Sequence, residues 1–443
     1  MAAKKGARPR TRTPRPGGAT AQSTSGTGSI DDMLLAALDR GDSSLETGRF
    51  LISYKEGALD AGLKSLSAMG MRTADARDFD AQNVNVTDVG DADAIVFPEI
   101  GVALISGDAM QSRSMSVTNE TESDDPAQVI EPEYFVFADS DMNAYLRGFS
   151  RAAATIAADF GVSDDTSDSD DVEAEVLGVT WGLSACRVPP SARSGFGIRV
   201  AVLDTGFDLG HPEFVGRVAA AASFVGQPVQ DLHGHGTHCI GTACGPIAPA
   251  GLIQRYGIAH RSQIFVGKVL TNSGSGSTAS VLAGMNWAIA NRCTVISMSL
   301  GSQAPVQAAY TNAGNAALNL GLLIVAAAGN AGSTTGAPAN SPSIFSVASL
   351  DRTLTPSSFS NFGKIDIAAP GRDVYSAAPR PRLHATMSGT SMAAPHVAGC
   401  AALWAQVAPS LRGRVLWARL QAAARRLPPL PASRVGAGLV QAP

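Results

Sequence analysis

Short apolar runs alternate with helix-like segments through the second half of the chain. Four apolar runs, each ending in small or polar residues, lie at 198–206, 263–270, 293–301 and 321–330. Between them, residues 278–291 and 305–321 have the spacing of helices. Strands that alternate with helices predict the α/β class, with a parallel sheet sandwiched by helices. In such a sheet the chemistry gathers at the carboxyl ends of the strands, where Asp204, the 299–301 turn and Asn330 fall.

The first part of the chain has a different pattern. Strand-like runs occur at 49–55, 94–107 and 129–138, and a run with helical spacing occurs at 58–70. Pro98 and Pro132 are expected at strand edges or breaks, because proline cannot donate a hydrogen bond to a neighbouring strand. We therefore expect a small α+β domain over residues 44–138.

Two segments have too few apolar residues for a core of their own. Residues 1–43 begin with a basic stretch and are expected to be a disordered or weakly helical leader, with binding to nucleic acid or an anionic surface as the alternative. Residues 139–177 are expected to be a linker, with a short helix at 146–161 and an acidic run at 162–175. A calcium site is the alternative for the acidic run, which lacks a glycine turn and the usual ligand spacing. The remaining residues, 178–443, form the larger domain.

Composition narrows the class of protein. Hydrophobic residues make up 45% and charged residues 16%, and the net charge of −4 argues against a nucleic-acid partner for the molecule as a whole. The five cysteines are scattered and odd in number, which argues against a disulfide framework. No apolar run approaches the ~20 residues that span a bilayer, and no apolar segment follows the basic start as a secretory signal requires. We expect a cytoplasmic protein without a membrane span, and export by another route stays open.

The stretch LHGHGTHCIG, residues 232–241, places His233, His235 and His238 within six positions. This spacing fits a zinc site, since neutral imidazole is a good zinc ligand. It fits equally a single catalytic base beside two histidines that take no part in the chemistry.

Three further side chains favour a catalytic base. Asp204 and Asn330 each follow an apolar strand-like run, and Ser391 begins a helical pattern. A serine hydroxyl becomes a nucleophile when an imidazole removes its proton and a carboxylate orients the imidazole. The Ser391 N–H and the Asn330 amide can then stabilise an oxyanion, and one such donor is worth about 3–4 kcal/mol.

The sequence resembles the subtilisin-like serine proteases (subtilases). The motifs that carry the resemblance are, in chain order, VAVLDTGFDLGHPEF, HGHGTHCIGT, KVLTNSGSGS, SMSLG, VAAAGN and GTSMAAPHVAG. The resemblance covers residues 178–443 and ends with VGAGLVQAP, which is similar to the strand that closes the family's domain. It implies a catalytic triad of Asp204, His235 and Ser391, with Asn330 as the oxyanion donor and no metal at the site.

The resemblance also implies roles for the neighbouring histidines. His238 is expected to pack in the helix that follows His235, and His233 has no assigned role. Zinc would require further ligands and would leave Ser391 and Asn330 unexplained.

By the same resemblance, a peptide substrate pairs as a strand between two short segments. These segments are Gly274, Ser275 and Gly276 on one side and Ser299, Leu300 and Gly301 on the other. The implied primary pocket is lined by Ser299, Leu300, Gly301, Ala327, Ala328 and Gly329, with Gly336 near its base. Because these residues are small and uncharged, we expect the pocket to accept a large apolar side chain of the substrate. The alternative is that they only allow tight packing.

The resemblance implies that the chemistry needs no cofactor. Many family members carry an Asn-rich calcium loop in the helix after the catalytic histidine. Residues 244–260 contain no Asp, Glu or Asn, so that calcium site is not expected here, and structural calcium elsewhere stays open.

Residues 44–138 resemble, more loosely, the propeptide of this family, an α+β domain that inhibits the protease by placing its C-terminal tail in the active site. A separate binding domain is the alternative, because some forty residues follow before the larger domain begins. The whole chain is thus predicted to be a serine endopeptidase made as a zymogen, which acts on peptides or proteins and cuts itself between about 139 and 178. A peptide ligase or macrocyclase stays open as a variant of the same chemistry. A non-catalytic scaffold would be marked by loss of a triad residue, and none is lost.

Overall fold

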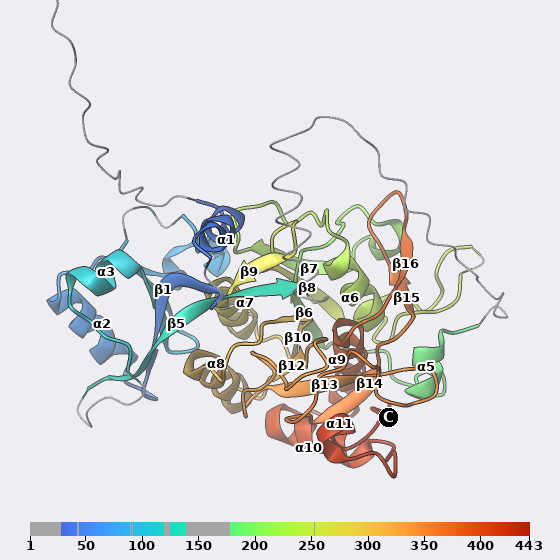
Figure 1. Cartoon of the computed structure of the whole chain (residues 1–443). Coiled ribbons are helices and arrows are strands. Elements are labelled where there is room, and N and C mark those ends of the chain that lie inside the picture. Colours follow the sequence, from blue (N-terminus) through green and yellow to red (C-terminus); the bar gives the residue numbers. More distant parts are fainter. Residues whose placement is uncertain are drawn as a thin grey trace, which may run out of the picture.

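A computed structural model describes most of the chain (Figure 1). The described residues are 28–41, 44–88, 90, 92–118, 125–138, 178–251 and 253–443. The predicted linker over 139–177, with its helix and acidic run, lies outside them. So do the first 27 residues of the predicted leader.

A seven-stranded parallel sheet forms the centre of the larger domain (Figure 1). Its strands, in spatial order, are β14 (Ile367–Pro370), β13 (Phe345–Leu350), β12 (Leu323–Ala327), β10 (Val295–Met298), β6 (Arg199–Asp204), β8 (Gln263–Lys268) and β7 (Val218–Ser223). Every neighbouring pair is parallel. The predicted α/β class is confirmed.

Helices cover both faces of this sheet, which is why its strands are apolar throughout. One face carries α6 (His235–Cys244) and α9 (Thr390–Val407), and the other carries α7 (Thr278–Ala290) and α8 (Ala308–Asn319). The side chains of β6 alternate between the two faces of the sheet. Val200 and Val202 pack on the face with α6 and α9, and Ala201 and Leu203 pack on the face with α7 and α8.

Smaller elements complete the larger domain. They are α5 (Trp181–Ala185), the 3-10 helix η3 (Pro212–Phe214), the hairpin of β15 (Val374–Ala377) and β16 (His384–Met387), α10 (Gly413–Ala423) and α11 (Ala432–Val435). The expected closing strand is reduced to isolated bridges of Leu439 with Ala368 and Arg425. Within the described ranges, no helix combines the length and apolarity needed to cross a membrane.

The N-terminal unit is an α+β layer with a small core of its own on one face, while Leu51, Phe97 and Leu104 on the other face pack into the core that holds α7 and α8. Its elements are β1 (Glu46–Tyr54), α2 (Leu59–Ala68), β2 (Thr73–Asp75), the 3-10 helices η1 (Ala76–Asp78) and η2 (Asp80–Gln82), β3 (Ala94–Phe97), β4 (Val102–Ile105), α3 (Gly107–Ser112) and β5 (Ala127–Ala138). The apolar run at 94–107 is a hairpin rather than one strand, with Pro98 in its turn. Pro132 lies in the half of β5 that pairs with β1 alone.

The last part of the predicted leader is helical, the second of the two states expected for it, rather than disordered. Helix α1 (Ile30–Asp39) begins with a capping box between Ser29 and Asp32. Its apolar face, Ile30, Leu34 and Ala37, is fully buried against β5 and the larger domain. The segment IDDMLLAALD has apolar residues at helical spacing, but a helix of ten residues is marginal alone, and packing supplies what it lacks in length.

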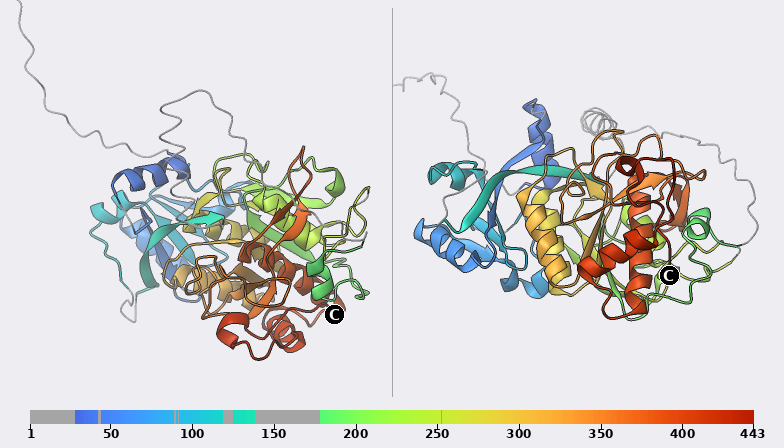
Figure 2. Two further views of the ribbon diagram at one scale, coloured as in Figure 1. Left: turned by 45° about the vertical axis from the view of Figure 1, so that its right-hand side comes forward. Right: turned by 90° about the horizontal axis from the view of Figure 1, so that it is seen from below.

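Strand β5 joins the two parts of the molecule, and Figure 2 shows it from two further sides. Its first half pairs with β1, while its last four residues lie between β9 (Ser275–Ser277) and β11 (Leu300–Gly301) of the larger domain. Both of the latter pairings are antiparallel. The end of the N-terminal unit thus occupies the groove between the two segments expected to bind substrate.

Candidate active site

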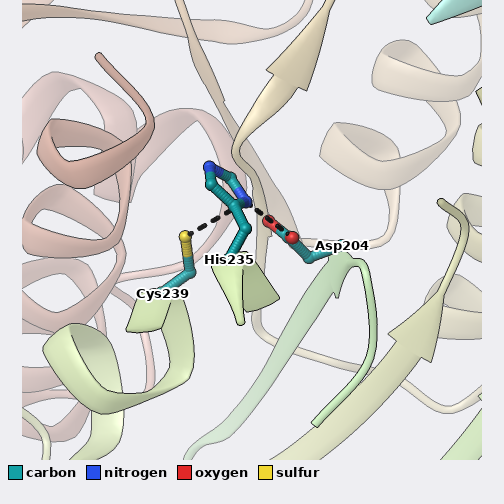
Figure 3. Close-up of side chains that lie close together, drawn as sticks. All are labelled: Asp204, His235 and Cys239. Carbon is teal, nitrogen blue, oxygen red and sulfur yellow. Dashed lines mark hydrogen bonds and ion pairs between the residues drawn. The ribbon is translucent and has the colours of Figure 1, made fainter. Parts of the chain in front are cut away.

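The carboxyl end of β6 and the start of α6 bring an aspartate and a histidine together (Figure 3). His235 Nδ1 donates to Asp204 Oδ1 over 2.7 Å. The Thr205 N–H donates to the same oxygen over 2.7 Å, which helps to fix the carboxylate. Both side chains are buried. This hydrogen bond selects the tautomer of His235 that leaves Nε2 without a proton.

The electrostatics of His235 suit a general base. Burial alone would lower its pKa, but the Asp204 carboxylate and the Cys239 thiol beside the ring raise the pKa well above the usual histidine value. Nε2 has no hydrogen-bond partner among the described residues, although it is buried. An unpaired buried acceptor is costly, so this nitrogen is poised to receive a proton.

Ser391 is the second residue of α9, where backbone N–H groups and the helix dipole favour negative charge. Its hydroxyl donates to the Ser299 carbonyl over 3.3 Å, and the Ser299 hydroxyl donates to the Ser391 carbonyl over 2.8 Å. Cys239 Sγ lies 3.5 Å from the Ser391 carbonyl oxygen and 4.0 Å from His235 Nδ1. The thiol therefore contacts both His235 and the backbone of Ser391.

Asn330 follows β12 and is oriented by the residue before Ser391. Its side-chain oxygen accepts from the Thr390 N–H over 2.8 Å and from the Thr390 hydroxyl over 2.9 Å. With the oxygen engaged, the amide nitrogen is the group that faces Gly389, where an added Cβ would lie 2.9 Å from it. The predicted oxyanion donor thus lies beside the predicted nucleophile with N–H groups to offer.

The three histidines of the 232–241 stretch do not point to a common centre, although the rings of His233 and His235 lie edge to face with centroids 6.2 Å apart. His238 Nε2 donates to the carbonyls of Val374 and Ala385, and burial lowers its pKa to about 3. The packing role expected for His238 agrees with these contacts. His233 lies against the substrate edge, since a Cβ on Gly274, whose φ is +81°, would be 2.9 Å from its Nε2.

Among the described residues, Asp204, His235 and Cys239 bring potential metal-ligand atoms within 4.8 Å of one another. A metal on His235 Nδ1 would displace the proton that this nitrogen shares with Asp204. The donor set therefore fits a proton relay better than a metal site, and the three-histidine zinc arrangement is not formed.

Asp231 has a structural role that the sequence analysis missed. Its buried carboxylate accepts from the N–H groups of His233, Gly234 and Thr237 and from the hydroxyls of Thr205 and Thr237, over 2.7–3.0 Å. Asp231 thus fixes the start of α6, which carries His235, to the residue after Asp204. The sequence does hold a signal for this role. It is an aspartate four positions before the histidine and just ahead of a helix, where a carboxylate can accept hydrogen bonds from the first N–H groups.

The two predicted substrate-binding segments form the edges of one groove. Phe137 pairs with Ser275 on one side and Gly301 on the other, and Ala138 pairs with Leu300. The Ala138 N–H also donates to the Gly274 carbonyl over 2.8 Å. The side chains alternate, with Val136 and Ala138 in the core of the larger domain and Phe135 and Phe137 against α1.

The residues predicted for the primary pocket come from two segments, 299–301 after β10 and 327–329 at the end of β12, with Gly336 beyond them. Gly336 N–H donates to the Ala328 carbonyl, and the Gly336 and Gly301 positions approach other backbone within 2.3–2.7 Å of an added Cβ. Close packing alone therefore requires glycine at both positions. The identity of the side chain that the pocket would accept stays a prediction.

Comparison with known proteins agrees with these motifs. Residues 195–438, more than half of the chain, match the sequence profile of the Subtilase family. The chain is 41% identical over 239 residues to the alkaline protease of Alkalihalobacillus alcalophilus, which is 52% of this chain and 61% of that protein, so less than two thirds of that relative is spanned. It is 41% identical over 239 residues to Subtilisin Savinase of Lederbergia lenta, covering 86% of that protein and 52% of this chain. It is also 41% identical over 215 residues to thermitase of Thermoactinomyces vulgaris, covering 76% of that protein and 48% of this chain. On the profile match and these identities, the chain belongs to the subtilase family.

Proposed function

We propose that this subtilase is a serine endopeptidase that hydrolyses peptide bonds through Asp204, His235 and Ser391. The observation that carries the proposal is the 2.7 Å hydrogen bond from His235 Nδ1 to Asp204, which leaves Nε2 of the neutral ring without a proton and without a hydrogen-bond partner among the described residues. The activity of the relatives, whose names include protease and subtilisin, supports the same reaction.

The proposed chemistry follows from these positions. His235 Nε2 takes the proton of the Ser391 hydroxyl, which rotates away from the Ser299 carbonyl, and Ser391 Oγ attacks the peptide carbonyl. The Ser391 N–H and the Asn330 amide donate to the oxyanion. His235 then gives the proton to the leaving amine as the peptide C–N bond breaks. In the second half of the reaction, water loses a proton to His235, attacks the acyl-enzyme and releases Ser391. Asp204 stabilises the imidazolium throughout. No step requires a metal or an organic cofactor, and structural calcium stays open.

We further propose that the N-terminal unit inhibits the enzyme as a propeptide. Its support is the last part of β5, which fills the groove between β9 and β11 with antiparallel pairing on both sides. A substrate peptide adds to an exposed strand edge in the same way, with main-chain hydrogen bonds for affinity. A unit that occupies both edges therefore competes directly with substrate.

Charged side chains of β5 strengthen this docking. Glu131 accepts from the N–H groups of Ala308 and Ala309 at the start of α8, and Glu133 accepts from the Ala279 N–H at the start of α7. Carboxylates at helix N-termini are stabilising. Glu133 is also paired with Arg49 through two hydrogen bonds of 2.6 and 2.9 Å.

The first experiment compares the intact mass of the purified full chain with that of a Ser391→Ala variant. We expect only the unsubstituted chain to split, with a new N-terminus within 139–178. The register of β5 favours a cut near the start of this range, which lies outside the described residues. If both proteins stay whole, the N-terminal unit is a permanent domain and activity must be tested on added peptides. If both split, another protease makes the cut.

Two finer points are part of the proposal. The pocket of small residues after β12 is proposed to prefer a large apolar side chain, which a peptide library would test. The proposed location is the cytoplasm, and it is supported by five buried cysteines, each unbridged.

A further inference from the structure

Three hydroxyl groups meet at the turn before β9, on the edge of the peptide groove. They belong to Thr271, Ser273 and Ser275, which we call the hydroxyl cluster. Thr271 Oγ1 lies 2.7 Å from Ser273 Oγ and 3.0 Å from Ser275 Oγ. Backbone hydrogen bonds between Thr271 and Gly274 and between Thr271 and Ser275 hold the turn, so the three hydroxyls keep one direction.

A carboxylate sits on this cluster in the intact chain. Asp31 Oδ1, from the first turn of α1, accepts hydrogen bonds from all three hydroxyls, at 3.0 Å from Thr271 and 2.6 Å from Ser273. The buried ammonium of Lys268, three positions before Thr271, is attracted electrostatically by the same carboxylate. Three converging donors with a nearby cation match the requirements of an anionic ligand.

We propose that the hydroxyl cluster is a carboxylate-binding subsite of the peptide groove, which Asp31 fills in the intact chain and an acidic substrate side chain fills once the N-terminal unit has left. The inference rests on the proposed endopeptidase function and adds a substrate preference to it.

The register of β5 identifies the substrate position that faces the cluster. Phe137 is directly opposite Ser275, and both side chains are on the face that α1 covers. Directly paired residues of antiparallel strands have Cβ atoms about 4.5–5.5 Å apart, a gap that a glutamate side chain spans. In the intact chain Phe137 packs against the apolar face of α1, and Asp31 of the same helix supplies the carboxylate.

The same register fixes the distance to the scissile bond. Ala138 is opposite Leu300, so the next residue of an extended peptide comes opposite Ser299, whose carbonyl contacts the Ser391 hydroxyl. Ser391 would attack the carbonyl of that residue. The acidic side chain is thus expected on the third residue before the scissile bond.

The test uses two peptides that differ only by Glu or Gln at this third position. The enzyme is the full chain after its own cleavage, and product masses identify the bond cut. We expect kcat/KM to favour the Glu peptide about tenfold, the scale of one hydrogen bond to a charged group. The preference should fall toward unity in Ser273→Ala and Thr271→Val, whereas Ser410→Ala, an exposed position in the larger domain, should retain it. Equal rates on both peptides in the unsubstituted enzyme, or a preference that survives both substitutions, would overturn the subsite.

A second measurement is independent of catalysis. In the uncleaved Ser391→Ala chain, Asp31→Asn and Ser273→Ala should each lower Tm, and the double variant should lose less than the sum of the two. Asp39→Asn, exposed at the other end of α1, is the charge-matched control. Additive losses would overturn the carboxylate site. Absence of cleavage of both peptides would instead refute the endopeptidase, and this cycle would still decide whether the cluster binds a carboxylate.

Discussion

At the scale of single residues, the pairing of Asp204 with His235 governs the pH dependence of the proposed reaction. His235 acts as a base only when neutral, and its pKa is raised well above the usual histidine value by Asp204 and Cys239, against the opposite effect of burial. Activity should therefore fall as pH decreases through this raised pKa, which places the acid limb of the kcat/KM profile above about 6.5.

Asp204→Asn tests this assignment. The substitution removes the charge that raises the pKa and favours the wrong tautomer, so the acid limb should move to lower pH while kcat falls about 10⁴-fold, as in other Ser-His-Asp enzymes. The measurement is a pH profile of peptide hydrolysis for both proteins. A variant with full kcat would remove Asp204 from the triad.

Asp231 should act on catalysis through position rather than charge transfer. Asp231→Asn keeps the shape of the side chain but presents an NH₂ group to N–H donors, leaving at least one buried donor unpaired at about 1–3 kcal/mol. We expect a lower Tm in the Ser391→Ala background and a kcat reduced roughly tenfold at nearly constant KM, since a small misplacement of His235 is sufficient. The acid limb should stay in place, unlike that of Asp204→Asn. A shifted limb would mean that Asp231 tunes the pKa of His235 directly.

At the scale of elements, the sequence indicated most of the larger domain and less of what surrounds it. Its strands and helices were predictable because burial on both faces makes each strand an unbroken apolar run. The run at 94–107 was misleading for the same reason, because its apolar residues continue on both sides of the turn that divides β3 from β4. Motif spacing predicted the roles of Asp204, His235, Ser391 and Asn330, and these roles stay predictions. It did not indicate Asp31, whose partners lie some 240 positions away and are brought near only by the folded chain.

Strand β5 carries two glutamates with opposite pKa shifts, the half-buried Glu131 and the buried Glu133, and they should respond differently to substitution. Burial raises the pKa of Glu131, against two backbone hydrogen bonds, so its charged form is already disfavoured. For Glu133, burial works in the raising direction, but Arg49 and its other partners hold the pKa below the usual value. Glu133→Gln leaves the guanidinium of Arg49 without its buried counterion, at a cost on the order of 3 kcal/mol.

The comparison is made by thermal unfolding of the uncleaved Ser391→Ala chain. Glu131→Gln should lower Tm less, because the amide still offers one oxygen to the two N–H groups of α8 and no buried cation loses its counterion. Glu133→Gln should lower Tm clearly. If both substitutions lower Tm equally, the ion pair of Glu133 with Arg49 adds nothing to stability beyond the hydrogen bonds that each glutamate accepts at a helix start.

At the scale of the whole molecule, the path of β5 determines how the proposed self-cleavage should proceed. The strand leaves the N-terminal unit and enters the groove of its own larger domain, so substrate and nucleophile belong to one chain and meet at a high effective concentration. Cleavage should therefore be first order, with a rate constant that does not change over a hundredfold range of protein concentration. The measurement follows the intact chain by mass or gel over time at several dilutions.

Mixing in the Ser391→Ala chain provides the control, since its own β5 fills its groove and it should stay whole while the unsubstituted chain is cut. A rate that rises with concentration, together with early cleavage of the Ser391→Ala chain, would mean that the groove is vacated often enough for one molecule to process another.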